Sequence, residues 1–360
     1  MSLNSILADD LRERAVFLAR YDVTMRNRMV ALLKQLERDV TRRMMDLDEF
    51  GELTAAGRQR MEAIIGWTRS TIANAYKGMN EASVEQLVNL ARNEVKFVER
   101  SINQGVGVQL LDTSVTPAGL AEIVSNTMIR GNPMEEWWAG QAVDLGRKFA
   151  AEMRIGMAAG ETLSQLVQRV RGTSMNGFQD GIMQTATRNA AALVRTAVQS
   201  VSNNTRMKVY KENSDVVGSL QHVSTLDDRT TDVCKARDGL RWTLDGEPIG
   251  HDMRFDQPPL HWNCRSTLIP VTKTWREMGF DVDELTPAQR ASMDGAVPAD
   301  MTYEKWLKTK GEGFQDRVLG QEKAQMWRDG EITFRDLVDQ TGRPLTLEEL
   351  QDVATVRDLK

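Results

Sequence analysis

The side chains best suited to chemistry lie close together in this chain. Its two cysteines and three histidines all fall between His222 and Cys264, about an eighth of the 360 residues. Cysteine and histidine are common zinc ligands, and they also supply many catalytic nucleophiles and bases. The compact pair His261-x-x-Cys264 follows two prolines, and Cys234 lies further upstream. A metal site or a reactive thiol in this stretch is therefore the first hypothesis.

The spacing favours a zinc site with three candidate ligands, Cys234, His261 and Cys264. Zinc takes about four N, S or O ligands, and closely spaced pairs close a loop at little entropic cost. Position 231 is threonine, so a second pair of the form C-x-x-C is incomplete. The fourth ligand stays open among several residues, with His222 as the working choice: His222, His251, Asp228 and Asp232. A bound metal would stabilise a small module with little core by on the order of 10 kcal/mol.

Other roles for the two thiols also fit the sequence. Cys234 and Cys264 could be small buried apolar residues, and a disulfide between them stays open. Synthesis in a reducing cytoplasm favours thiols that are free or metal-bound. A catalytic dyad of either cysteine with His261 lacks any nucleophile-elbow or protease signature.

A metal-dependent nuclease or another enzyme acting on DNA is the alternative from a different functional class. An HNH-type site would use His261, Asn263 and the pair Asp227-Asp228. No helix with a metal-binding histidine follows the expected hairpin, and Pro270 opposes one there. A catalytic zinc site would keep a coordination position for water, whereas a structural site uses protein ligands at every position.

The composition is that of a globular protein and excludes several classes. Apolar residues make up 41% and charged residues 27%, and the net charge of −5 gives no general surface for binding polyanions. No run of about 18 apolar residues occurs, so no membrane-spanning segment is expected. The N-terminus reaches acidic residues by Asp9 and lacks the order of a secretory signal. Two cysteines are too few for a disulfide scaffold.

Most of the chain shows the periodicity of helices, with apolar residues three or four apart. Helices are predicted over 11–47, 55–77, from a cap at Asn80 to about 104, from Thr116-Pro117, and over 134–159, 161–171 and 180–212. Short strands are predicted at 216–225, 240–244 and 268–271, around a loop at 248–263. After Thr272 the chain is predicted to be helical again, with breaks near 295–298 and 342–344.

These elements predict a mainly α protein with a small α+β module that holds the cysteines and histidines. Four regions are expected: a helical N-terminal region at 1–110, a helical middle region ending in a long helix at 111–215, the strand-containing Cys/His module at 216–272, and a helical C-terminal tail at 273–360.

Two blocks of the sequence, STLDDRTTDVCKARDG (224–239) and PPLHWNCRSTLIPV (258–271), resemble the phage head-morphogenesis family of phage Mu F-like proteins. The family pattern is D-x-R-T after a strand, a Cys or His, then D-G, and then P-x-H-x-x-C-R. The matching positions are Asp227, Arg229, Thr230, Cys234, Asp238, Gly239, Pro259, His261, Cys264 and Arg265. The preceding helix and the tail are also similar, so the resemblance covers roughly 180–350.

The resemblance implies a minor capsid protein of the virion rather than an enzyme. Such a protein is present in few copies, binds the portal protein, the major capsid protein or both, and lies in the inner head during assembly. Contact with packaged DNA, and a part in its packaging or delivery, stay open. Many relatives carry a second cysteine before the one that matches Cys234 and end the motif C-R-C. This chain has Thr231 and Ser266 at those positions.

The polar residues of the motif have structural roles that need no catalysis. Asp227 is expected to accept hydrogen bonds from backbone N–H groups of the turn after it. Arg229 and Arg265 are expected to pair with carboxylates such as Asp227 or Asp238 and to tie the two blocks together. Gly239 would supply a turn position with positive φ.

Overall fold

The computed structural model describes residues 3–46, 55–106, 109, 111, 115–273, 289–292, 295–298 and 300–358. The chain forms two compact units, each assembled from segments that are distant in sequence. The first unit contains Met1–Leu18, Ala91–Pro117 and Gln199–Lys360, and the second contains Ala19–Leu90 and Ala118–Val198. The predicted fold class, mainly α with a small α+β module, is confirmed.

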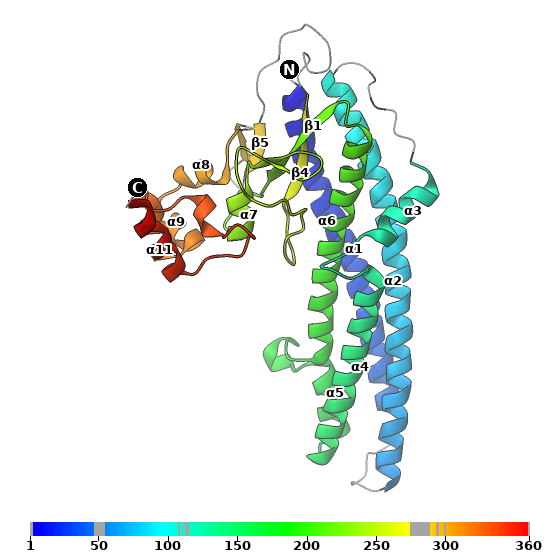
Figure 1. The fold of residues 1–360 in the computed structure, drawn as a ribbon. Helices are drawn as coiled ribbons and strands as arrows, with labels where there is room; N and C mark the ends of the chain where they lie inside the picture. Colours follow the sequence, from blue (N-terminus) through cyan, green and yellow to red (C-terminus); the bar gives the residue numbers. More distant parts are fainter. Residues whose placement is uncertain are drawn as a thin grey trace. The chain divides into compact units, whose positions relative to one another are not determined.

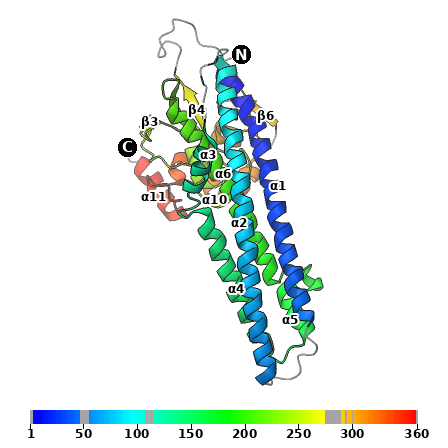
Figure 2. The same cartoon turned by 90° about the vertical axis from the view of Figure 1, so that its right-hand side faces the viewer.

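Long helices make up the second unit (Figures 1 and 2). The elements of this part of the chain are α1 (Leu3–Met45), α2 (Ala55–Val106), α3 (Pro117–Asn126), α4 (Met134–Ala158), α5 (Leu163–Arg171), η1 (Ser174–Asn176) and α6 (Ile182–Glu212). Helices α1, α2 and α6 contribute residues to both units. In the second unit, Met25, Met29 and Leu33 of α1 are buried on one face, as their spacing predicts.

Most helix boundaries agree with the sequence prediction because local signals define them. Helix α3 begins at Pro117, which is tolerated in a first turn. Helix α5 begins after Thr162, whose hydroxyl accepts a hydrogen bond from the Gln165 backbone, while the Gln165 side chain accepts one from the Thr162 N–H at 2.8 Å. This reciprocal capping box satisfies two donors that a helix start leaves unpaired.

One predicted boundary is wrong, because α2 continues through the cap expected at Asn80. Tyr76, Met79, Ser83 and Leu87 are all buried, so one face of the helix stays packed across the predicted break. An asparagine cap contributes only about 1 kcal/mol, which the packing of a whole face outweighs.

The first unit contains a four-stranded antiparallel sheet with strand order β3-β2-β1-β4. The strands are β1 (Val217–Val223), β2 (Arg241–Trp242), β3 (Pro248–Ile249) and β4 (Thr267–Thr272). A short helix that the sequence analysis did not predict, α7 (Asp232–Arg237), connects β1 to β2. The end of α6 lies against β4, where Thr267 Oγ1 donates to Asn203 Oδ1 at 2.8 Å and accepts from Arg206 Nη1 at 3.0 Å.

A buried ion cluster joins three helices of the first unit around Glu94 of α2. The Glu94 side chain has no solvent exposure, and it accepts hydrogen bonds from Arg14 Nε at 3.1 Å, Arg206 Nε at 2.8 Å and Ser202 Oγ at 2.8 Å. Burial alone would raise the pKa of Glu94, but the charges of Arg206 and Arg14 outweigh it and hold the pKa below its ordinary value. Both guanidinium groups also lie over the Phe97 ring.

The C-terminal part of the first unit packs on the module through its own apolar core. Its helices are α8 (Tyr303–Lys308), α9 (Glu312–Leu319), α10 (Gln321–Arg328), η2 (Phe334–Leu337) and α11 (Leu347–Asp358). Leu226 of the module is fully buried in one core cluster with Tyr303, Trp306 and Phe334. The Tyr303 hydroxyl donates to the Asp227 carbonyl oxygen at 2.5 Å, which adds a polar contact between the same two segments.

The predicted break in the helical pattern near 295–298 is confirmed, and the helical prediction for 274–288 lies outside the described residues, but residues 289–292 are not helical. Strands β5 (Gln289–Ser292) and β6 (Gly295–Pro298) pair antiparallel instead. Glycine and proline disfavour a helix interior, and a glycine beside a short connection suits a hairpin. The predicted break near 342–344 is confirmed, because Gly342 has φ +86° and no helix includes it. No helix in the described part of the chain is long and apolar enough to cross a lipid bilayer.

Candidate metal centre

The first ligand candidate, Cys234, is positioned by α7. Thr231 precedes this helix in an extended conformation, and its carbonyl oxygen accepts hydrogen bonds from the N–H groups of Cys234 and Lys235 at 3.0 and 2.9 Å. The Cys234 carbonyl oxygen accepts from Ser224 Oγ at 2.8 Å, which ties the helix to the segment after β1. The thiol is 2% exposed and lies on the inner side of the helix.

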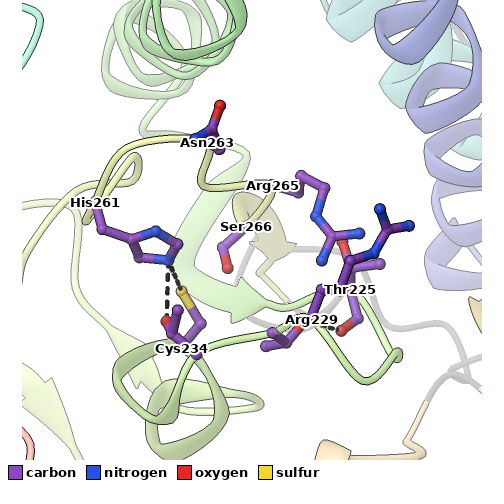
Figure 3. Close-up of a pocket in the computed structure, with 9 residues that line it drawn as sticks. Thr225, Arg229, Cys234, His261, Asn263, Arg265 and Ser266 are labelled. Carbon is purple, nitrogen blue, oxygen red and sulfur yellow. Dashed lines mark hydrogen bonds between the residues drawn. The ribbon is translucent and has the colours of Figure 1, made fainter. Parts of the chain in front are cut away.

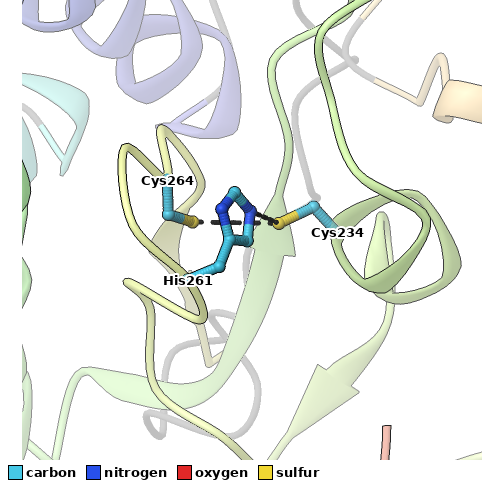
Figure 4. A group of neighbouring side chains, drawn as sticks. All are labelled: Cys234, His261 and Cys264. Carbon is cyan, nitrogen blue, oxygen red and sulfur yellow. Dashed lines mark hydrogen bonds between the residues drawn. The ribbon is translucent and has the colours of Figure 1, made fainter. Parts of the chain in front are cut away.

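The other two candidates, His261 and Cys264, come from a tight turn before β4. The Cys264 N–H donates to the His261 carbonyl oxygen at 3.2 Å, and Asn263 takes a φ of +61° within the turn. Asparagine is one of the residues that tolerate this left-handed conformation. The turn presents His261 half-buried and Cys264 fully buried, both toward Cys234 (Figure 4).

The three ligand atoms form one compact group. Cys234 Sγ lies 3.3 Å from His261 Nε2 and 3.8 Å from Cys264 Sγ, and all three atoms lie within 4.8 Å of one another. Both cysteines are free thiols. In the part of the chain that the structure describes, this is the group of cysteine, histidine and carboxylate side chains close enough to hold a metal ion.

Hydrogen bonding fixes the state of the His261 ring. Its Nδ1 lies 2.9 Å from the Trp262 carbonyl oxygen, which can only accept a hydrogen bond, so Nδ1 carries the proton. Nε2 therefore presents a lone pair toward the Cys234 thiol. A backbone carbonyl on the second nitrogen is a common way to orient a metal-binding histidine.

The two thiols titrate as a pair. A hydrogen bond from one sulfur to the other lowers the pKa of Cys264, because the Cys234 S–H donates to the thiolate. The same hydrogen bond and the burial of the group raise the pKa of Cys234.

A small pocket that opens to solvent borders the group (Figure 3). Most of the residues that line it have polar side chains: Thr225, Arg229, Thr230, Thr231, Cys234, His261, Asn263, Arg265 and Ser266. Thr231 Oγ1 lies 3.0 Å from His261 Nε2, so this exposed hydroxyl adjoins the ligand group on the solvent side. Sequence reasoning gave Thr231 no role, although its place three residues before Cys234 was the available signal.

None of the residues considered as a fourth ligand belongs to the group. His222 is fully buried on β1, opposite Leu268 of β4. His251 directs Nε2 to the Arg241 carbonyl oxygen at 2.8 Å and Nδ1 to the Met253 N–H at 3.1 Å. Asp232 Oδ1 accepts from Lys235 Nζ at 3.0 Å, and Asp228 is exposed outside the group.

The polar motif residues hold the two sequence blocks together. Asp227 accepts from the Arg229 N–H at 3.1 Å and from Thr230 Oγ1 at 3.2 Å, and it forms a two-point ion pair with Arg265. Burial works to raise the pKa of Asp227, but hydrogen bonding and charge from Arg265 leave it below the ordinary value. Arg229 is exposed and contributes its backbone to this turn.

Asp238 and Gly239 form the second tie. Asp238 accepts from the Ser224 N–H at 2.7 Å and from the Tyr303 N–H at 2.7 Å, which joins the segment after β1, the end of α7 and α8. Gly239 has φ +84°, as expected for its turn. The contact with Tyr303 was not predicted, because nothing in the motif points to a residue 65 positions away.

Comparison with known families supports the sequence resemblance over part of the chain. Residues 147–269 match the family model described as phage Mu protein F like protein. The match includes α6, strands β1 to β3, the first three residues of β4 and all three ligand candidates, and it ends before the C-terminal helices. No curated protein and no solved structure matches the chain.

Proposed function

We propose that the protein is a phage minor head protein that binds the portal protein, the major capsid protein or both during head assembly. The observation that carries the proposal is the match of residues 147–269 to phage Mu F-like proteins, which spans α6 and the Cys/His module. We place the protein in the inner head near the portal, with contacts to its partners made by the helical regions. Assistance in DNA packaging or delivery is a further part of this proposal.

The internal contacts of the module support a structural role. The ion pair of Asp227 with Arg265, and the hydrogen bonds that Asp238 accepts, join segments far apart in sequence. Each of these polar groups is engaged in holding the fold. We infer that the module is a folding knot that fixes α6 and the C-terminal helices to a small sheet.

The pocket walls also favour a structural role over the nuclease alternative. Hydrolysis by a metal-bound water needs a group that takes its proton, commonly a carboxylate or histidine near the metal. The residues that line the pocket include no carboxylate, and His261 already has Nδ1 bonded to a carbonyl oxygen.

Co-expression of the full chain with the portal and major capsid proteins of the same phage tests the proposal. We expect the chain to sediment with assembled heads in a few copies per particle, and to remain with the portal when heads are dissociated. A chain that stays a solitary monomer and never enters heads would contradict the assignment.

The enzyme alternative has its own discriminating result. Cys264→Ser should weaken folding or incorporation into heads, with no DNA cleavage to lose in the unaltered protein. If the unaltered chain cleaves DNA, and Cys264→Ser assembles normally without cleaving, the cluster is catalytic and the structural role is wrong.

A further inference from the structure

We propose that Cys234 Sγ, His261 Nε2 and Cys264 Sγ bind one Zn²⁺ ion, whose fourth coordination position lies beside Thr231 and opens to solvent. Metal binding at this site does not depend on the proposed role in head assembly, and either proposal can be wrong without the other. One position is left to water, which is also the arrangement of a catalytic zinc site, but the residues that line the pocket include no carboxylate that could take a proton from that water.

Two of the three separations between ligand atoms fit zinc before any metal is added, and the third, between His261 Nε2 and Cys264 Sγ, is within 4.8 Å. Zinc bonds to sulfur are about 2.3 Å and to histidine nitrogen about 2.0–2.1 Å, and the geometry is tetrahedral. Those values place two sulfur ligands about 3.8 Å apart, and a sulfur and a nitrogen about 3.6 Å apart. The observed separations are 3.8 Å between the sulfurs and 3.3 Å between Cys234 Sγ and Nε2.

The hydrogen bonds around the ligand residues also favour metal binding. The Nδ1 hydrogen bond to the Trp262 carbonyl oxygen leaves Nε2 as the metal-binding nitrogen. The Cys234 carbonyl oxygen is bonded to Ser224 Oγ, and Ser266 Oγ lies 3.4 Å from the same hydroxyl, so serines support the buried side. Two soft sulfur donors with one imidazole select zinc over magnesium or calcium, which prefer oxygen.

The position of Thr231 defines the open side of the site. Its Oγ1 lies 3.0 Å from Nε2, at the mouth of the polar pocket, while the two cysteines lie below the surface. A neutral hydroxyl is not among the usual zinc ligands. A zinc-bound water would therefore fill the fourth position and donate a hydrogen bond to Thr231.

The first test is metal content. The full chain, purified without chelator, should contain about one zinc per chain by elemental analysis, and Cys234→Ser and Cys264→Ser should each lose it. His251→Ala, a histidine outside the group, should retain it. Absence of zinc from the unaltered chain, together with no binding when zinc is added at micromolar concentration, overturns the proposal.

The second test adds a ligand instead of removing one, so a loss of folding cannot produce the expected result. Thr231→Cys places a third sulfur at the open position and should raise zinc affinity at least tenfold in competition with a chromophoric chelator. With Co²⁺ as the probe, sulfur-to-cobalt absorption should grow by about half as two thiolates become three. Thr71→Cys on α2 is the control for an added thiol outside the group, because Thr71 Oγ1 donates to the Trp67 carbonyl oxygen at 2.9 Å. Equal affinity in the two variants overturns the assignment of the fourth position.

Discussion

Replacing Glu94 with glutamine tests how far the buried ion cluster stabilises the first unit. The carboxylate is fully buried and is the acceptor for two guanidinium groups and a serine hydroxyl. Glutamine keeps the shape and one acceptor oxygen, but it leaves Arg14 and Arg206 without a counter-charge. Removing one partner from a buried ion pair destabilises a protein by about 3–5 kcal/mol.

Urea unfolding at pH 7, followed by circular dichroism and by hydrogen exchange of α1 and α6, measures this loss. With an m value of about 2–3 kcal/mol per M, a loss of 3–5 kcal/mol lowers the midpoint by about 1–2.5 M. The matched control is Glu62→Gln on the same helix, whose carboxylate pairs with Arg154 at 2.9 Å but is 55% exposed. We expect little change there, because exposed ion pairs are hydrated and screened.

The result that would refute this reasoning is an equal midpoint shift for Glu94→Gln and Glu62→Gln. Such a result would mean that water or rearranged side chains compensate the two arginines as well as the carboxylate does. The pH dependence gives an independent check. Because the folded pKa of Glu94 lies below its unfolded value, its contribution is complete above the unfolded pKa and is lost as the pH falls through the folded pKa.

Three further predictions concern the module and its neighbours. Gly342→Ala should destabilise the protein by about 1–3 kcal/mol more than Gly330→Ala in urea titrations. Both glycines have positive φ, but only at Gly342 would a Cβ meet the guanidinium of Arg237, which is buried and paired with Asp256; equal losses would exclude a clash. Asp227→Asn should reduce the loss of unfolding free energy that the protein shows as the pH falls below about 4. The folded pKa of Asp227 is lowered mainly through Arg265, so its contribution to stability is lost in that range. An unchanged dependence of the unfolding free energy on pH would show that the ion pair does not couple to folding. Adding EDTA should lower the melting temperature of the zinc-loaded chain, and zinc should restore it; a melting curve indifferent to both would argue against metal-linked folding.

Local patterns predicted most helices, because each has its own signals of spacing and capping. The ranges for α4, α5 and α6 agree with the structure within two residues. The predicted break at Asn80 was wrong because it rested on a single cap residue, and the packing that keeps the helix continuous cannot be read from the local sequence. Helix α7 was not predicted because six residues show too little periodicity to distinguish a helix from a turn.

The candidate site was also predictable only in part from the sequence. The pair His261 and Cys264 was readable from sequence, since three positions in one turn stay close in any fold. The approach of Cys234 to this pair depends on sheet pairing between β1 and β4, and the family pattern supplied what spacing alone left open. The place of Thr231 and the distance of His222 from the group follow from the three-dimensional arrangement of α7 and β1, which no local pattern encodes.

The hydrogen bonds of Asp238 and Tyr303 indicate that the segment that folds cooperatively extends further along the chain than the similarity to the family model. Similarity to the family model stops at residue 269, yet Leu226 is buried in one core cluster with Tyr303 and Trp306. A fragment cut after β4 would expose that leucine and leave two buried acceptors of the module without their N–H and O–H donors. Proteolysis or truncation of the C-terminal helices is therefore expected to loosen the Cys/His module itself, so dissection of this protein should keep the two segments in one piece.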